Sequence, residues 1–68
     1  MRIELNGEAA ELADGATVED AVRSVGVELN GRGVAVAVDG DVVRRPDWQA
    51  VALREGQSVE IVRAVQGG

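Results

Sequence analysis

The sequence predicts an α+β fold in which a mixed sheet of four to five strands carries one helix across one of its faces. Short apolar stretches alternate with polar residues at a period of two, which is typical of half-buried strands. Only one stretch has helical spacing. Valine is the commonest residue, with 13 copies in the 68-residue chain. Valine favours strands because its branched side chain is stiff and packs well on a pleated sheet.

The first predicted element is a β-hairpin. Ile3 and Leu5 alternate with polar residues, so one face of the first strand is expected to be buried. Asn6-Gly7 follows, and this pair is preferred in tight hairpin turns. The returning strand then continues through Ala10 and Leu12.

One helix is predicted to follow. Thr17 is a good N-cap because its hydroxyl can accept a backbone N–H from the first turn. Asp20 stands where a capping box usually has Glu or Gln, so the box is expected to be imperfect. Gly26 supplies the left-handed residue that ends the helix. The apolar positions follow the i, i+3, i+4, i+7 rule and form one stripe: Val18, Ala21, Val22 and Val25.

Three more strands are predicted after the helix. In Val34–Val38, valine and alanine alternate, so the valines should face the helix and the alanines the opposite surface. The turn Asp39-Gly40-Asp41, whose carboxylates are expected to lie in water, leads into a short strand at Val42-Val43. An irregular segment then contains Trp48, the sole aromatic residue, which should cover one end of the core. The last strand is expected over Ser58–Val65.

The order of these elements predicts the topology. A hairpin followed by one crossover helix places the first and last strands side by side and parallel. This is the β-grasp, or ubiquitin-like, architecture. A chain of 68 residues has room for one domain. We expect residues 1–63 to form the β-grasp domain and residues 64–68 to form a flexible C-terminal Gly-Gly tail.

The composition excludes most side-chain chemistry. The chain has no Cys, His or Lys, so thiolate zinc sites, Schiff bases and the common nucleophile–base pairs cannot be built. A net charge of −5 argues against binding to nucleic acid or an anionic membrane surface. No apolar run approaches the roughly 18 residues that span a bilayer. A soluble cytoplasmic protein is therefore expected.

The remaining polar side chains have structural explanations. The hydroxyls of Thr17, Ser24 and Ser58 fit a helix cap, a solvated helix face and a strand start. The Arg44-Arg45 pair could bind a phosphate or a partner's carboxylate, but a solvated loop is the simpler interpretation. The turn carboxylates do not provide the roughly six oxygen ligands that a hard cation needs. We therefore expect no catalytic side chain and no metal site.

One reactive group remains, the carboxylate of Gly68. Gly67 and Gly68 lack Cβ, so with Gln66 and Val65 behind them they can thread a channel too narrow for other residues. The five residues from Ala64 onward reach about 17 Å when extended, which is enough to enter a partner's active site. Coupling to AMP would activate the carboxylate. A sulfur nucleophile could then displace AMP and leave a thiocarboxylate.

Several stretches resemble a known family along the whole chain. They are Ile3–Gly7, Thr17-Val18, Val36–Val43, Arg45 with Trp48, Glu55-Gly56, Val59–Val62 and Ala64–Gly68. These stretches are similar to the ThiS family, the sulfur carriers of thiamine thiazole biosynthesis, and the final dozen residues are the most specific. The chain departs from the family at Asp39, where Asn is frequent, and at Arg44, where Pro is frequent.

The resemblance implies a mechanism. An E1-like adenylating enzyme, ThiF, would use ATP and magnesium to adenylate Gly68, and a sulfur-donor system would form the thiocarboxylate. Thiazole synthase, ThiG, would receive the sulfur. The chain would bind no cofactor itself and would be a cosubstrate, not an enzyme. The partner surface is a hypothesis. It is expected on the small-residue face of the sheet, continuing into Val65, at Ala35, Ala37, Glu60 and Val62.

Three alternatives stay open. The small subunit of molybdopterin synthase has the same fold and tail chemistry, although such chains usually carry Phe-Pro-rich residues where Val62–Val65 stands here. A ubiquitin-like interaction module would have an inert terminus, and a protein modifier would be joined to lysines. An enzyme acting alone is least favoured because the chain offers no nucleophile–base pair.

Overall fold

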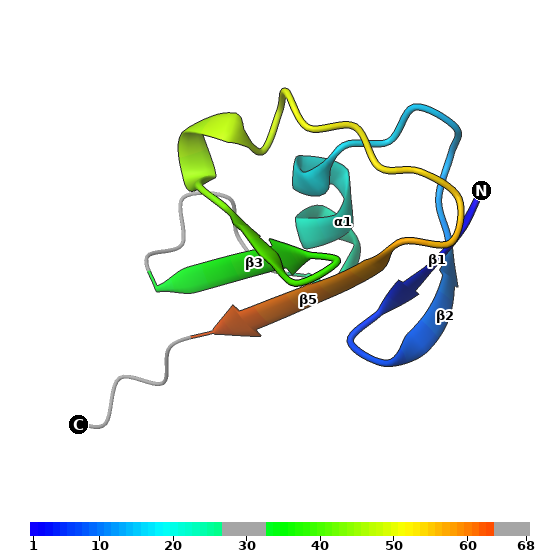
Figure 1. Ribbon diagram of the computed structural model, residues 1–68, viewed down its shortest axis with the longest axis horizontal. Helices are drawn as coiled ribbons and strands as arrows, with labels where there is room; N and C mark the ends of the chain where they lie inside the picture. Colours follow the sequence, from blue (N-terminus) through cyan, green and yellow to red (C-terminus); the bar gives the residue numbers. More distant parts are fainter. Residues whose placement is uncertain (27–32, 64–68) are drawn as a thin grey trace.

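The computed structural model describes residues 1–26 and 33–63, in which one five-stranded sheet carries a helix across one face (Figure 1). The strand order is β2-β1-β5-β3-β4. β5 is parallel to β1 and antiparallel to β3, so the predicted α+β topology is confirmed. The elements are β1 (Arg2–Leu5), β2 (Glu8–Glu11), α1 (Val18–Ser24), β3 (Val34–Val38), β4 (Asp41–Val43), the 3-10 helix η1 (Arg45–Asp47) and β5 (Ser58–Arg63).

The predicted first hairpin is present. Asn6 and Gly7 have φ values of 50° and 84°, and two left-handed residues in succession match the twist of the flanking strands. Leu5 pairs with Glu8, and Ile3 pairs with Ala10. This register places Ile3 in the core.

The capping box of α1 is complete, so the prediction of an imperfect box was wrong. The Asp20 N–H donates to Thr17 Oγ1 at 3.4 Å, and the Thr17 N–H donates to Asp20 Oδ2 at 2.9 Å. The shorter carboxylate of Asp reaches the cap backbone as Glu would. Thr17 is also bridged to Ala52, so the helix start is held by the chain that follows η1.

The apolar stripe of α1 is shorter than predicted. Val18, Ala21 and Val22 are buried, but Val25 is 38% exposed. The helix ends at Ser24 and Val25 is already its C-cap, so the turn that would have carried Val25 onto the sheet does not form. Gly26 has a φ of 80°, which confirms the predicted left-handed stop.

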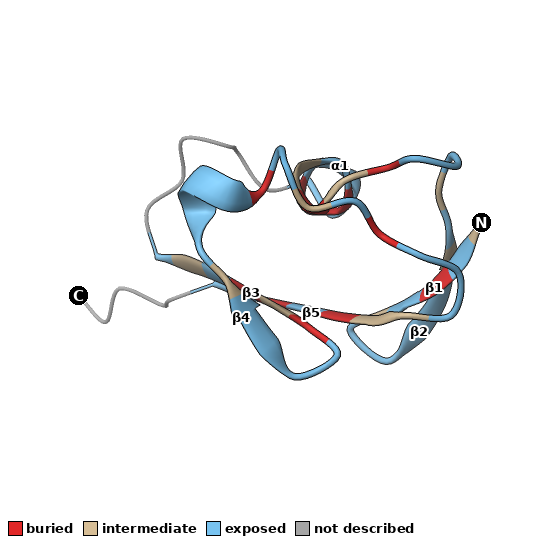
Figure 2. Cartoon of the chain, turned by 45° about the horizontal axis from the view of Figure 1, so that its top comes forward, coloured by how far each residue is buried: buried red, intermediate tan, exposed pale blue. Residues whose placement is uncertain are grey.

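The core lies between α1 and the sheet, where Figure 2 shows the buried segments facing one another. Val36 and Val38 of β3 are buried, while Ala35 is exposed on the opposite surface, as predicted. Trp48 closes the core and is 4% exposed. The buried cluster consists of Ile3, Val18, Ala21, Val22, Val36, Val38, Trp48, Leu53, Val59 and Ile61.

The segment around Trp48 is more regular than the sequence predicted. Pro46 lies in the first turn of η1, where its missing N–H costs no hydrogen bond. The backbone beyond η1 then attaches to the start of α1, with the Val18 N–H donating to the Val51 carbonyl at 3.0 Å. The Leu53 N–H donates to the Ala16 carbonyl at 2.8 Å.

Candidate functional site

The predicted reactive tail lies outside the described residues. This applies to Val65, Gln66, Gly67 and Gly68, and to the part of the predicted last strand beyond Arg63. The site can therefore be built from its base, which is β5. This strand lies in the middle of the sheet, between β1 and β3 (Figure 1). Its last residue, Arg63, pairs with Val34 of β3.

The side chain of Asn6 holds β5 on its other side. The Ile61 N–H donates to Asn6 Oδ1 at 2.7 Å, and Asn6 Nδ2 donates to the Ile61 carbonyl at 3.3 Å. Sequence reasoning assigned Asn6 a turn role only. These residues are 55 positions apart, and the Asn-Gly signal predicts a turn without predicting what the amide contacts.

Asp39 makes the corresponding contact at the start of β5. The Ser58 N–H donates to Asp39 Oδ1 at 2.9 Å, and Gln57 Nε2 donates to Asp39 Oδ2 at 3.1 Å. Asp39 is left-handed, with a φ of 49°. Its carboxylate is exposed, as predicted, and it is also hydrogen-bonded to the chain, which the turn motif did not predict. Asp41 is exposed.

The sheet surface opposite α1 brings together the four residues predicted to bind a partner. Ala35 pairs with Val62, and Ala37 pairs with Glu60. Whether a partner binds here stays a prediction. The sequence analysis did not include Val42 in this surface, although the two-residue Asp39-Gly40 turn places Val42 opposite Ala37. Val62 is 59% exposed and Val42 is 75% exposed. We call this surface the open face: Ala35, Ala37, Val42, Glu60 and Val62.

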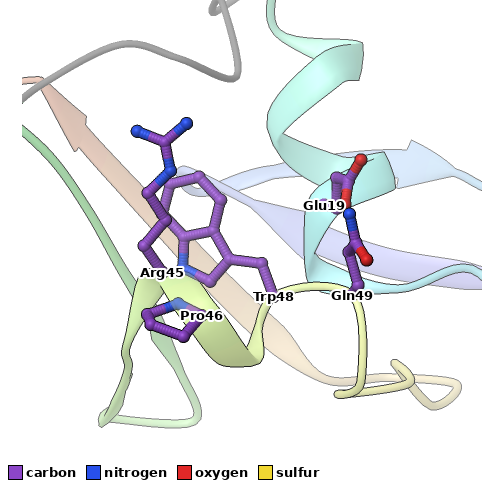
Figure 3. Close-up of a pocket in the computed structure, with 5 residues that line it drawn as sticks. All are labelled: Glu19, Arg45, Pro46, Trp48 and Gln49. Carbon is purple, nitrogen blue, oxygen red and sulfur yellow. The ribbon is translucent and has the colours of Figure 1, made fainter.

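A hollow of about 420 Å³ lies on the other side of the molecule, between η1 and α1 (Figure 3). Arg45 is exposed, as predicted, and its guanidinium also lies over the Trp48 indole, with Cζ 5.8 Å from the ring centroid. Glu19 Oε1 is paired with Arg23 Nη2 at 3.0 Å. The hollow brings no nucleophile together with a base, because its lining is Glu19, Arg45, Pro46, Trp48 and Gln49.

Two further classes of feature are absent from residues 1–26 and 33–63. No group of three or more Asp or Glu side chains in this part is arranged to hold a metal ion. No helix in the same part of the chain has the length and apolar character needed to cross a membrane.

A family model described as the ThiS family matches residues 3–68 of the chain. The chain belongs to the ThiS family. The match covers all of the sheet except Arg2 and continues through Gly67-Gly68, which the structure does not describe. The resemblance predicted from the sequence is thereby confirmed.

Individual ThiS proteins agree with this assignment. The chain is 38% identical over 64 residues to the sulfur carrier protein ThiS of Thermus thermophilus, covering 94% of this chain and 95% of the relative. It is 24% identical to the thiamine biosynthesis protein ThiS of Geobacter metallireducens. The crystal structure of that protein has a TM-score of 0.80, with both chains fully covered. Its solution structure has the same TM-score and is covered to 88%. These likenesses confirm the predicted β-grasp fold.

Proposed function

We propose that this ThiS-family chain carries sulfur on the carboxylate of Gly68 and donates it for thiazole formation in thiamine biosynthesis. The observation that supports this most directly is the family match, which continues through Gly67-Gly68. The fold supports it as well. The strand that precedes the tail lies in the middle of the sheet, and its last residue, Arg63, is paired with β3, so the domain can present the tail from a firm base.

The proposed chemistry takes place on the backbone terminus. The Gly68 carboxylate attacks the α-phosphorus of ATP and releases pyrophosphate, giving an acyl adenylate. Hydrosulfide then attacks the acyl carbon, AMP leaves with the electron pair of the broken acyl–phosphate bond, and a thiocarboxylate remains. An adenylating enzyme of the ThiF type binds ATP and magnesium and supplies the catalytic groups, which suits a chain without Cys, His or Lys. A sulfur-donor system and a thiazole synthase of the ThiG type complete the partners.

The open face is the surface we propose for docking the adenylating enzyme. Val62 lies on β5, one residue before Arg63 and six before Gly68, so a partner seated there would be beside the exit of the tail. Exposed valines beside alanines give this surface an apolar part, and the buried centre of a protein interface is usually apolar. Glu60, on the same surface, can steer a basic partner during encounter.

Intact mass spectrometry tests the proposal. The chain is incubated with the adenylating enzyme, ATP, magnesium and sulfide. A mass increase equal to replacing one oxygen by sulfur, mapped to Gly68, is expected. A chain lacking Gly68 and a chain with one added residue after Gly68 are the matched controls, and both should stay unmodified. An unmodified wild-type chain under conditions that convert the Thermus relative would contradict the proposal.

Two further experiments, a binding measurement and a reconstitution, separate the alternatives. A ubiquitin-like module with an inert terminus would bind its partners equally well without Gly68. Reconstitution of the thiocarboxylate form with a thiazole synthase, and in parallel with the large subunit of molybdopterin synthase, distinguishes the two sulfur acceptors. Sulfur transfer to the molybdopterin precursor alone would reject the thiazole assignment.

A further inference from the structure

We propose that Asn6 is a positioning residue for the tail, because its side-chain amide holds the end of β5 in the sheet and so sets where the chain leaves the domain. This inference rests on the proposed function, since the reaction at Gly68 is what would use the positioned tail. Asn6 is far from Gly68 in the sequence, but it holds the strand from which the tail leaves the domain.

The parallel pairing between β1 and β5 stops well before β5 ends. The last paired residues are Leu5 and Val59, and the Asn6 N–H makes the final backbone bond of this ladder to the Val59 carbonyl at 2.9 Å. β5 continues to Arg63. Its final residues therefore have β3 on one side but no backbone of β1 on the other.

Asn6 fills this gap with its side chain. In a continued parallel ladder, the Ile61 N–H would bond to the backbone carbonyl of Asn6. At Asn6 the chain instead turns into the hairpin with a left-handed φ of 50°. Asn6 Oδ1 takes the place of that carbonyl, at 2.7 Å from the Ile61 nitrogen, and Nδ2 returns a bond to the Ile61 carbonyl.

Asparagine suits both demands on this position. It adopts the left-handed conformation more readily than most residues, and its amide has a donor and an acceptor. Aspartate would keep the acceptor for the Ile61 N–H but lose the donor. Glycine would keep the turn, since it favours positive φ, and would lose both side-chain bonds. Asn6→Asp and Asn6→Gly therefore dissect the contact without straining the hairpin.

Asp39 provides a matched control. It too is a left-handed residue before a turn glycine, and it too accepts a bond from a β5 backbone N–H. Its contact is with Ser58, at the start of β5, and not near the tail. Asp39→Gly therefore removes a similar interaction from the same strand while leaving Ile61 and its bonds to Asn6 in place.

The first measurement is amide hydrogen exchange by NMR on the full chain. In Asn6→Gly, protection of the Ile61 amide should fall about tenfold, the scale of one lost hydrogen bond. The Val36 amide, in the core of β3, should change much less. Asn6→Asp should retain most Ile61 protection, and Asp39→Gly should affect Ser58 instead. Unchanged Ile61 protection in Asn6→Gly would overturn the inference.

The second measurement is steady-state adenylation by the ATP-dependent partner enzyme. Asn6→Gly should lower kcat several-fold and change KM less than about twofold, because the open face that docks the enzyme is untouched. Asp39→Gly should leave kcat near the wild-type value. Equal losses of kcat in both variants would show a general stability effect and overturn the positioning role. Failure of the wild-type chain to be adenylated would instead overturn the proposed function, so the two failures are distinguishable.

Discussion

The indole of Trp48 donates a hydrogen bond from Nε1 to the backbone carbonyl of Val43 at 2.9 Å. This bond ties the largest side chain of the core to the last residue of β4, which is an edge strand of the sheet. A buried indole N–H usually finds such a partner. The contact therefore joins the layer that contains α1 and η1 to the far edge of the sheet.

Replacement of Trp48 by Phe should destabilise the domain. The smaller ring leaves space in the core and the Val43 carbonyl loses a donor, so the free energy of unfolding should fall by about 1–3 kcal/mol. Urea unfolding followed by far-UV circular dichroism measures the change, since the variant has no tryptophan fluorescence. Trp48→Ala should cost more, about 3–5 kcal/mol. A Phe variant as stable as the wild type would show that the Val43 contact contributes nothing.

Substitutions on the open face should weaken docking without unfolding the domain. In the double variant Val42→Thr and Val62→Thr, each side chain stays β-branched and already lies in solvent. The free energy of unfolding should then change by less than about 0.5 kcal/mol. Affinity for the adenylating enzyme should fall about tenfold, because two hydroxyls enter an apolar contact. Calorimetric titration measures the affinity of each variant for the adenylating enzyme. Val25→Thr, an exposed valine outside the open face, is the control, and an equal loss there would rule out a specific surface.

Charge reversal at Glu60 should slow association with the adenylating enzyme. Glu60→Arg removes an attractive rim charge, so the association rate should fall several-fold at low salt. The difference should shrink as salt screens the charges beyond about 10 Å at 0.1 M. Stopped-flow measurements at several salt concentrations test this. Glu8→Arg on the edge strand β2 is the control. If Glu60→Arg left the association rate unchanged, Glu60 would have no steering role.

Loss of the capping box should destabilise α1. Thr17→Ala removes the hydroxyl that accepts the Asp20 N–H, which should lower the free energy of unfolding by about 0.5–2 kcal/mol. Asp20→Asn keeps an acceptor oxygen for the Thr17 N–H and should cost less than Asp20→Ala. Thermal unfolding by circular dichroism checks the order of these variants. If all three variants were as stable as the wild type, the capping box would not stabilise the domain.

Local patterns predicted the elements of the fold because the interactions that form them lie close in the sequence. The Asn6-Gly7 turn, the Thr17 cap and the Gly26 stop each depend on a few neighbouring residues, and each is present. The alternation in Val34–Val38 also predicted correctly which side chains are buried. The same reasoning failed at Val25. The helix ends at Ser24, so the last position of the predicted apolar stripe is exposed.

Contacts of the candidate site were less predictable because they join distant segments. The bonds from Asn6 to Ile61 and from Asp39 to Ser58 span 55 and 19 positions. Nothing in either turn motif specifies them. Val42 joined the open face through its register with β3, which the valine pair alone does not reveal. The four open-face residues named from the sequence were grouped correctly because strand periodicity assigns a face.

The sequence by itself determined the order of the strands and of α1, the absence of Cys, His and Lys, and the Gly-Gly motif that suits a threaded tail. Those properties are carried by composition and short-range spacing. Only the tertiary structure decided how β5 is held, because a turn residue can bond a strand distant in sequence only after the sheet has brought them together. In this chain, formation of the sheet places the Asn6 amide against Ile61, at the point where the parallel pairing of β1 with β5 would otherwise have stopped.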